Sequence, residues 1–177
     1  MFASAPRVAI LIEDLFEDIE VTSPRDALTE AGAAVVLVGP MAGKAYAGKH
    51  GGVLTADLAA GDARADDFDA VVIPGGYAPD KMRLRHAMVD LVRDCLVAGK
   101  PVAAICHGPS VLVNARVLPG RTLTCWPSIA VDVKNAGGRY VDRPVVEDGN
   151  LITSRKPDDL PAFNDALLRQ LASRMAR

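Results

Sequence analysis

Residues 100–114, KPVAAICHGPSVLVN, decide the fold of this chain. The first half is a short apolar run of the kind that forms a buried strand, and the second half repeats apolar residues at helical spacing. Cys106 stands where the strand would run into the helix, and Gly108 follows where a sharp turn needs backbone freedom. The stretch therefore predicts a strand, a tight elbow and a helix, with a cysteine at the elbow.

Three similar apolar runs precede this unit, and stretches with helical patterns separate them. They are RVAILI at residues 7–12, AVVLVG at 34–39 and DAVVIPGG at 69–76. These runs are nearly continuous and do not alternate between apolar and polar residues, so we expect helices to cover both faces of the sheet. The order of elements predicts an α/β fold with a doubly wound, mostly parallel sheet and helices on both faces.

The other stretches complete this pattern. SPRDALTEAG offers Ser23 as the N-cap of a helix, Pro24 as its first residue and Gly32 as its end. Further helices are expected at 88–99, 110–118, 129–136 and 157–175. Hairpins are expected at 41–58 and at 144–154, where Asp148 and Gly149 supply the turn.

The composition limits the size of the protein and the partners it can attract. With 177 residues, half of them hydrophobic, the chain suits a single domain over residues 1–177. The 20 basic and 22 acidic residues leave a formal net charge of -2, so nucleic acid is not expected as a stable partner. No apolar stretch reaches the roughly 18 residues of a membrane span, and no secretory signal peptide is expected.

The cysteines indicate the compartment. Cys95, Cys106 and Cys125 form an odd set without zinc-ligand spacing, which argues against a disulfide framework and a zinc site. We therefore expect a reducing, cytoplasmic location. No phosphate-binding loop or metal-ligand cluster stands out in the sequence, so neither a cofactor nor a metal is expected.

In an open parallel sheet, ligands gather at the carboxyl ends of the strands. Those positions are residues 13–18, 75–80, 106–108 and 125–127. A thiol at the start of a helix lies near unpaired N–H groups and the positive end of the helix dipole, which favour the thiolate and could hold an oxyanion. We expect Cys106 to be a reactive nucleophile; the alternative is one more buried, apolar-like cysteine.

A histidine and an acid could complete this site. His107 follows the cysteine directly, so backbone geometry decides whether its ring turns back to the thiol. An acid from EDLFEDIEV, residues 13–21, leaves the first strand at the same sheet edge and could act as a general acid or base. We prefer Glu17 for this role, although composition alone does not distinguish it from its acidic neighbours. The alternative is a solvated acidic loop.

Six motifs cover nearly the whole chain: EDLFEDIEVTSP, GKHG, VVIPGGYAPDKMR, GKPVAAICHGPSVLV, VKNAGGRYVD and ITSRKPDDLPAFN. Together they resemble the ThiJ/PfpI family of class I glutamine-amidotransferase-like proteins, most closely its PfpI-type branch. The resemblance implies a flavodoxin-like fold and a homodimer or a higher homo-oligomer. Some members of that branch are described as intracellular proteases, and others as glyoxalases or protein deglycases that act on methylglyoxal adducts.

The resemblance also implies roles for particular residues. The family's nucleophile falls on Cys106, its adjacent histidine on His107, and its cysteine-contacting glutamate on Glu17. Protease-like members are proposed to complete a triad with a glutamate from a neighbouring subunit, and Asp80 stands at that place here. The shorter aspartate weakens the protease assignment because it could fail to reach the imidazole.

Four further residues are candidates for the pocket. Trp126 replaces a tyrosine that some relatives have near the pocket mouth, so substrate selection could differ. Gly75, Gly76 and Gly108 are candidates for the pocket wall or for an oxyanion site.

The preferred function is a cysteine-dependent, stress-protective enzyme of the glyoxalase or deglycase type. The Cys106 thiolate would add to the aldehyde of a small reactive carbonyl or a glycated protein, Glu17 would move protons, and water would release a hydroxy acid. One alternative is a cysteine peptidase that uses Asp80 of a neighbouring subunit. Another is a non-enzymatic redox sensor or holdase chaperone. A glutamine amidotransferase is less favoured because the distant His and Glu pair has no obvious counterpart.

Overall fold

The computed structural model describes residues 5–176, and its centre is a seven-stranded sheet of order β10-β11-β7-β6-β1-β2-β5. The four predicted apolar runs form adjacent parallel strands, namely β7 (Val102–Ile105), β6 (Ala70–Ile73), β1 (Arg7–Leu11) and β2 (Ala34–Gly39). Two more strands add in parallel, β11 (Leu151–Ser154) beside β7 and β5 (Leu58–Ala59) beside β2. Only β10 (Val145–Asp148) runs antiparallel, as one arm of the predicted hairpin. The predicted α/β fold class with a mostly parallel sheet is confirmed.

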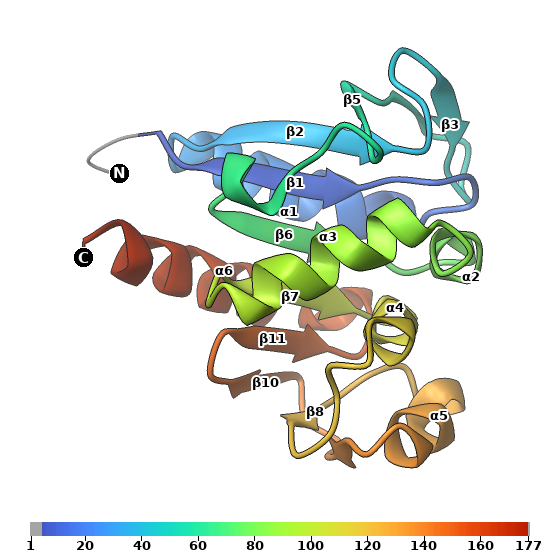
Figure 1. Ribbon diagram of the computed structural model, residues 1–177, viewed down its shortest axis with the longest axis vertical. Coiled ribbons are helices and arrows are strands. Elements are labelled where there is room, and N and C mark those ends of the chain that lie inside the picture. Colours follow the sequence, from blue (N-terminus) through green and yellow to red (C-terminus); the bar gives the residue numbers. More distant parts are fainter. Residues whose placement is uncertain (1–4, 177) are drawn as a thin grey trace.

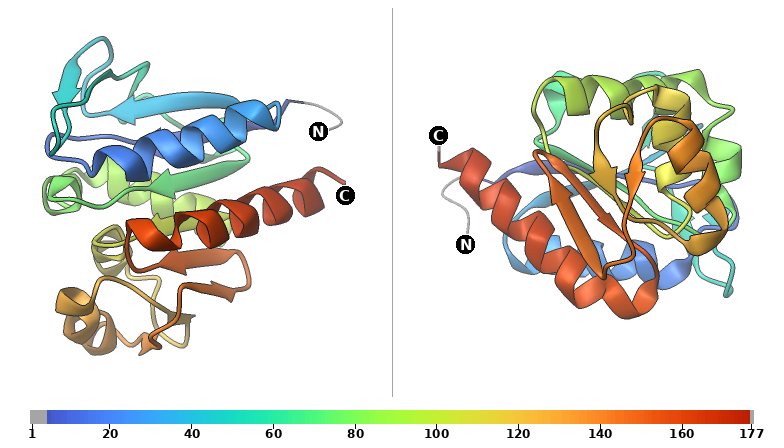
Figure 2. Two further views of the ribbon diagram at one scale, coloured as in Figure 1. Left: turned by 180° about the vertical axis from the view of Figure 1, so that it is seen from behind. Right: turned by 90° about the horizontal axis from the view of Figure 1, so that it is seen from below.

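Helices cover both faces of this sheet, as predicted. α1 (Asp18–Glu30) and α6 (Leu160–Met175) lie side by side on one face, and α3 (His86–Val97) and α4 (Pro109–Ala115) lie on the other (Figure 1, Figure 2). In β1, β6 and β7 every residue except Arg7 is buried. This burial on both faces explains why the strand sequences are apolar throughout.

Two small excursions leave the sheet. The predicted hairpin after β2 is formed by β3 (Ala45–Ala47) and β4 (Val53–Thr55), which pair antiparallel. Beyond α4, β8 (Thr122–Leu123) pairs with β9 (Arg139–Tyr140), and α5 (Ala130–Asn135) lies between them in the chain. No helix within residues 5–176 is both long and apolar enough to cross a membrane.

The beginning of α1 corrects the sequence-based boundary. The helix begins at Asp18 and not after Ser23, so Pro24 lies inside the helix. A proline there removes one hydrogen bond of the helix. The first turn is anchored from outside, because the Asp18 carboxylate accepts hydrogen bonds from two backbone N–H groups of the β3–β4 turn, at 2.7 and 2.8 Å. The predicted end at Gly32 holds, since this glycine has a φ of +92° just past the last helical turn.

Candidate active site

Cys106 lies at the elbow between β7 and α4. Its φ of 61° is in the left-handed region, which is strained for a non-glycine residue and persists only where the surroundings enforce it. The Cys106 N–H donates to the Ser154 carbonyl at 3.0 Å, and the Cys106 carbonyl accepts from Trp126 N–H at 2.8 Å. A side chain at Gly108 would place its Cβ 2.5 Å from the Ile73 carbonyl oxygen. The elbow therefore needs glycine at position 108. Hydrogen bonds at both the N–H and the carbonyl of Cys106 fix the backbone of the elbow.

The His107 ring turns back toward the thiol. Its Nδ1 is 3.4 Å from Cys106 Sγ, and its Nε2 is 3.2 Å from the Ser128 hydroxyl. The Trp126 ring stacks near it, with a centroid distance of 6.2 Å and an interplanar angle of 28°. Burial lowers the pKa of His107, and the positive charge of Lys49 lowers it further, so the imidazole is neutral at pH 7. A neutral imidazole can accept the proton of the thiol.

The carboxyl group that faces the cysteine belongs to Glu20. This side chain is fully buried, and its Oε2 accepts a hydrogen bond from Gly75 N–H at 2.7 Å. A Cβ on Gly75 would lie 2.5 Å from Glu20 Oε2 and 3.1 Å from Cys106 Sγ, so both groups lie against the same backbone atom. Burial raises the pKa of Glu20 to about 8; the Gly75 N–H opposes this rise, and the charge of Glu17 adds to it. Glu20 therefore carries a proton at neutral pH.

The expectation that Glu17 contacts the cysteine is wrong. Its carboxylate lies 2.8 Å from His50 Nε2 and 3.4 Å from Lys49 Nζ. Glu17 is the N-cap of α1, whereas Glu20 lies within the first turn and shares the buried face with Val21. A helix that starts after Ser23 would leave Glu20 outside it, so the sequence pattern does not predict that Glu20 lies on this inward face. Helical spacing from the observed start at Asp18 does predict it.

The resting thiol is not the thiolate that the sequence suggested. Cys106 is only 9% exposed. Burial raises the pKa of its thiol, ionisation of Glu20 would raise it further, and backbone N–H groups of Gly76 and His107 lower it. The thiolate is thus formed when a base takes the proton, and His107 Nδ1 is in place to do so. A redox sensor depends on a low thiol pKa, and the burial of Cys106 works against such a pKa.

The three candidate glycines differ in the hydrogen bonds of their N–H groups. Gly75 N–H is taken by Glu20, and Gly108 N–H donates to the Ile105 carbonyl at 2.8 Å. Neither is free to hold an oxyanion. Gly76 N–H points toward Cys106 Sγ, which leaves Gly76 as the candidate oxyanion donor of the three.

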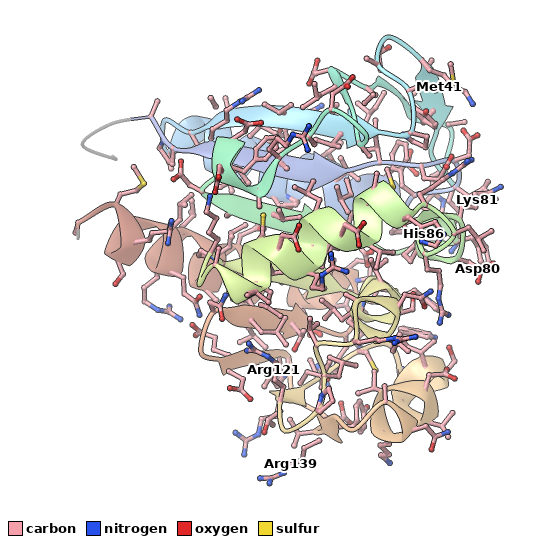
Figure 3. The ribbon with its side chains drawn as sticks, in the orientation of Figure 1. Met41, Asp80, Lys81, His86, Arg121 and Arg139 are labelled. Carbon is pink, nitrogen blue, oxygen red and sulfur yellow. The ribbon has the colours of Figure 1, made fainter. Side chains whose placement is uncertain are left out.

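Asp80 lies in the short helix α2 (Ala78–Met82), which follows the Gly75–Gly76 turn. Its side chain is exposed on the outer side of α2 (Figure 3). Both ring nitrogens of His107 face other groups, Cys106 and Ser128, so among residues 5–176 a hydroxyl and not a carboxylate orients the imidazole. A contact between Asp80 and His107 of a second copy stays a prediction.

Replacing Gly75 by alanine should disrupt the site. The new methyl group would meet Glu20 Oε2 and Cys106 Cβ, at 2.5 and 2.6 Å, so both side chains must move. We expect a loss of about 1–3 kcal/mol in the free energy of unfolding, measured in urea, and slower alkylation of Cys106 by iodoacetamide. Gly61→Ala is the matched control, since nothing lies within 4 Å of its Cβ position. Equal behaviour of the two variants would contradict this packing argument.

Replacing Ser128 by alanine should slow the alkylation of the Cys106 thiol without unfolding the protein. The exposed Ser128 hydroxyl is the polar group at His107 Nε2, so its removal leaves the ring free to turn. We expect Cys106 alkylation at neutral pH to fall about threefold to tenfold, the effect of one hydrogen bond. Ser128→Thr keeps the hydroxyl and should restore both the rate and its pH profile. An unchanged rate in Ser128→Ala would show that Ser128 does not position the imidazole.

The described residues contain no group of three or more His, Cys, Asp or Glu side chains that could hold a metal ion.

The DJ-1/PfpI family profile matches residues 6–170. The chain is 46% identical over 169 residues to "Protein/nucleic acid deglycase 2" of Escherichia coli K12, covering 94% of this chain and 98% of that one. It is also 46% identical over 165 residues to the "Putative cysteine protease YraA" of Bacillus subtilis 168, covering 93% and 98%.

Solved structures agree with this assignment. A two-domain protein from Anabaena variabilis with DJ-1/ThiJ/PfpI-like and ferritin-like domains superposes with a TM-score of 0.93 at 47% identity. The match covers 94% of this chain and 48% of that longer protein. Drosophila melanogaster DJ-1beta superposes with a TM-score of 0.88 at 30% identity, covering 98% and 95%. The fold, the cysteine elbow and these matches lead to one conclusion: the chain belongs to the DJ-1/PfpI family.

Proposed function

We propose that this protein is a cysteine-dependent enzyme that converts small reactive carbonyls, such as methylglyoxal or its adducts, into hydroxy acids. One observation carries the proposal: a buried carboxyl group that holds a proton, Glu20, and a neutral imidazole, His107, flank a single thiol. The reaction needs an acid and a base on either side of one nucleophile. The names of the relatives, a deglycase and a putative cysteine protease, support an enzyme of this family.

The first step joins the thiol to the aldehyde. His107 Nδ1 takes the thiol proton, and the sulfur attacks the aldehyde carbon, so that a C–S bond forms and the carbonyl π electrons move to oxygen. That oxygen takes the proton of Glu20, and the product is a hemithioacetal. Glu20 is now a carboxylate and His107 an imidazolium, so the proton donor and the proton acceptor have exchanged roles.

The next steps shift hydrogen between the two carbons. The Glu20 carboxylate removes the proton from the hemithioacetal carbon, and the neighbouring ketone oxygen takes the proton of His107, which gives an enediol. Return of the Glu20 proton to the second carbon, with loss of the first hydroxyl proton to His107, gives a thioester. Water then attacks the thioester, Glu20 takes the water proton, and the departing sulfur takes the His107 proton. One carbon is oxidised while its neighbour is reduced, so no external oxidant is needed.

Lactate formation tests this function. Chelator-treated protein is incubated with methylglyoxal, and lactate is followed by proton NMR. We expect lactate to accumulate catalytically, at many equivalents per protein. Absence of lactate with a folded protein and a reactive Cys106 would reject the proposal.

A cysteine peptidase is the second candidate. It is favoured by the distance of 3.4 Å between Cys106 Sγ and His107 Nδ1 and by the name of the Bacillus subtilis relative. This mechanism needs a carboxylate that accepts a hydrogen bond from the His107 imidazole, and Asp80 of a second copy is the candidate. Cleavage of a peptide substrate that is lost in Asp80→Asn would support it. Unchanged cleavage by a monomeric form would rule out the subunit-crossing mechanism.

A further inference from the structure

The β3–β4 hairpin lies beyond the carboxyl end of β1, at the same end of the sheet as α2 (Figure 1). Lys49 N–H donates to the Phe16 carbonyl at 2.8 Å, and the Asp18 carboxylate holds the N–H of His50. Phe16 also bridges to Gly48 on this turn and to Gly76 beside the thiol. The hairpin turn and the Gly75–Gly76 turn therefore both contact the backbone at Phe16.

From this turn the side chain of Lys49 reaches Glu17 and Tyr77. Its Nζ lies 3.4 Å from Glu17 Oε2 and 5.4 Å from the centroid of the Tyr77 ring. Tyr77 directly follows Gly76, whose N–H points toward the sulfur. The Lys49 side chain is 39% exposed, whereas that of Glu17 is 13% exposed. The ammonium group is thus the more accessible member of this ion pair.

The ammonium of Lys49 is a positive charge close to the groups that flank the Cys106 thiol. His107 and Glu20, the two groups that flank the sulfur, are both neutral at pH 7, and the charge of Lys49 acts on both. Glu17 is a carboxylate at the rim, but it already contacts Lys49 and His50. Lys49 thus carries a partly exposed ammonium whose charge reaches both groups beside the thiol, so it can act on an anion near Cys106.

We propose that Lys49 is a specificity-determining residue that draws in 1,2-dicarbonyl substrates that also carry a carboxylate, in preference to neutral 1,2-dicarbonyl compounds of the same size. The substrate class rests on the proposed function. The selection for negative charge is a property of the surroundings of the thiol, and it can be measured without turnover.

Iodoacetate and iodoacetamide form a matched pair of probes for this property. Both have the same leaving group and nearly the same size, and only iodoacetate carries a carboxylate beside the reactive carbon. In each case the sulfur forms a C–S bond, the C–I bond breaks, iodide leaves and a base takes the thiol proton. Second-order rates at Cys106 are measured by mass spectrometry and peptide mapping, which separates it from the fully buried Cys95 and Cys125.

We expect Lys49→Gln to lower the ratio of the iodoacetate rate to the iodoacetamide rate by about threefold to fivefold at low ionic strength, with the iodoacetamide rate little changed. Lys49→Arg should keep the ratio, and Glu17→Gln should raise it by removing the competing charge. Lys44→Gln is the control, since Lys44 is on the same hairpin but lies over the Tyr46 ring at 4.9 Å. Salt on the order of 0.5 M should reduce the difference between wild type and Lys49→Gln.

The outcomes separate this proposal from the proposed function. The same ratio in Lys49→Gln and Lys44→Gln would overturn the role of Lys49. A parallel fall of both rates would also overturn it, because Lys49 would then act only on the thiol itself. A shifted ratio without lactate formation from methylglyoxal would leave the charge selection standing and remove the glyoxalase assignment.

Discussion

Cys106→Ser is expected to abolish lactate formation from methylglyoxal, with a fall in turnover of about 10³-fold or more. A serine hydroxyl holds its proton far more tightly than a thiol does, and the base available to it is His107, whose pKa is lowered by burial. His107 is therefore a weaker base than this hydroxyl requires, and the serine nucleophile forms far less readily than the thiolate does. The measurement is lactate formed per protein per unit time, at substrate concentrations that saturate the wild type.

Cys125→Ala is the matched control for this variant. Cys125 is fully buried, and it precedes Trp126, whose N–H binds the Cys106 carbonyl. Its removal leaves a small cavity and should lower the free energy of unfolding by roughly 1 kcal/mol, while lactate formation stays within a few fold of the wild type. Lactate formation that persists in folded Cys106→Ser would remove the nucleophile from the mechanism, and with it the proposed function.

The sheet could be predicted from the sequence because its signal is local. Burial on both faces demands continuous apolar runs, and the four runs recur between helical stretches, so strand positions and order of elements follow from residue type alone. The start of α1 is different. Pro24 is favourable as a first helical residue, but the helix begins at Asp18 because that carboxylate captures N–H groups of a hairpin turn more than 30 residues away in the chain. No local pattern carries that contact.

The same division applies to the site. Cys106, His107 and Gly108 are adjacent in the chain, so the elbow was readable from one motif. Ser128 was missed because it reaches His107 only through the fold, from the turn after β8. The predicted thiolate is wrong for the resting site: a helix start favours a thiolate in general, but the burial of this sulfur follows from tertiary packing and raises the thiol pKa.

Glu20→Gln should separate stability from activity. In the folded protein burial raises the pKa of Glu20 from its ordinary value of 4.5 to about 8. The native state therefore binds this proton more tightly than the unfolded chain does. The resulting stability is fully present below about pH 4.5, and it is lost as the pH rises through 8. The total loss is on the order of 5 kcal/mol, because the side chain is fully buried. Glutamine has no proton to lose, so the variant should escape this decline.

The free energies of unfolding of wild type and variant are measured in urea at pH values from about 5 to about 9, in steps of about one pH unit. The stability of Glu20→Gln relative to wild type should rise steadily with pH, while lactate formation falls about 10²-fold or more because the proton carrier is gone. Glu30→Gln, at the exposed end of the same helix, controls for the loss of one acid. A pH-independent difference between wild type and Glu20→Gln would mean that Glu20 is already ionised in the folded protein. In that case its carboxyl could not supply the proton that the attack on the carbonyl requires.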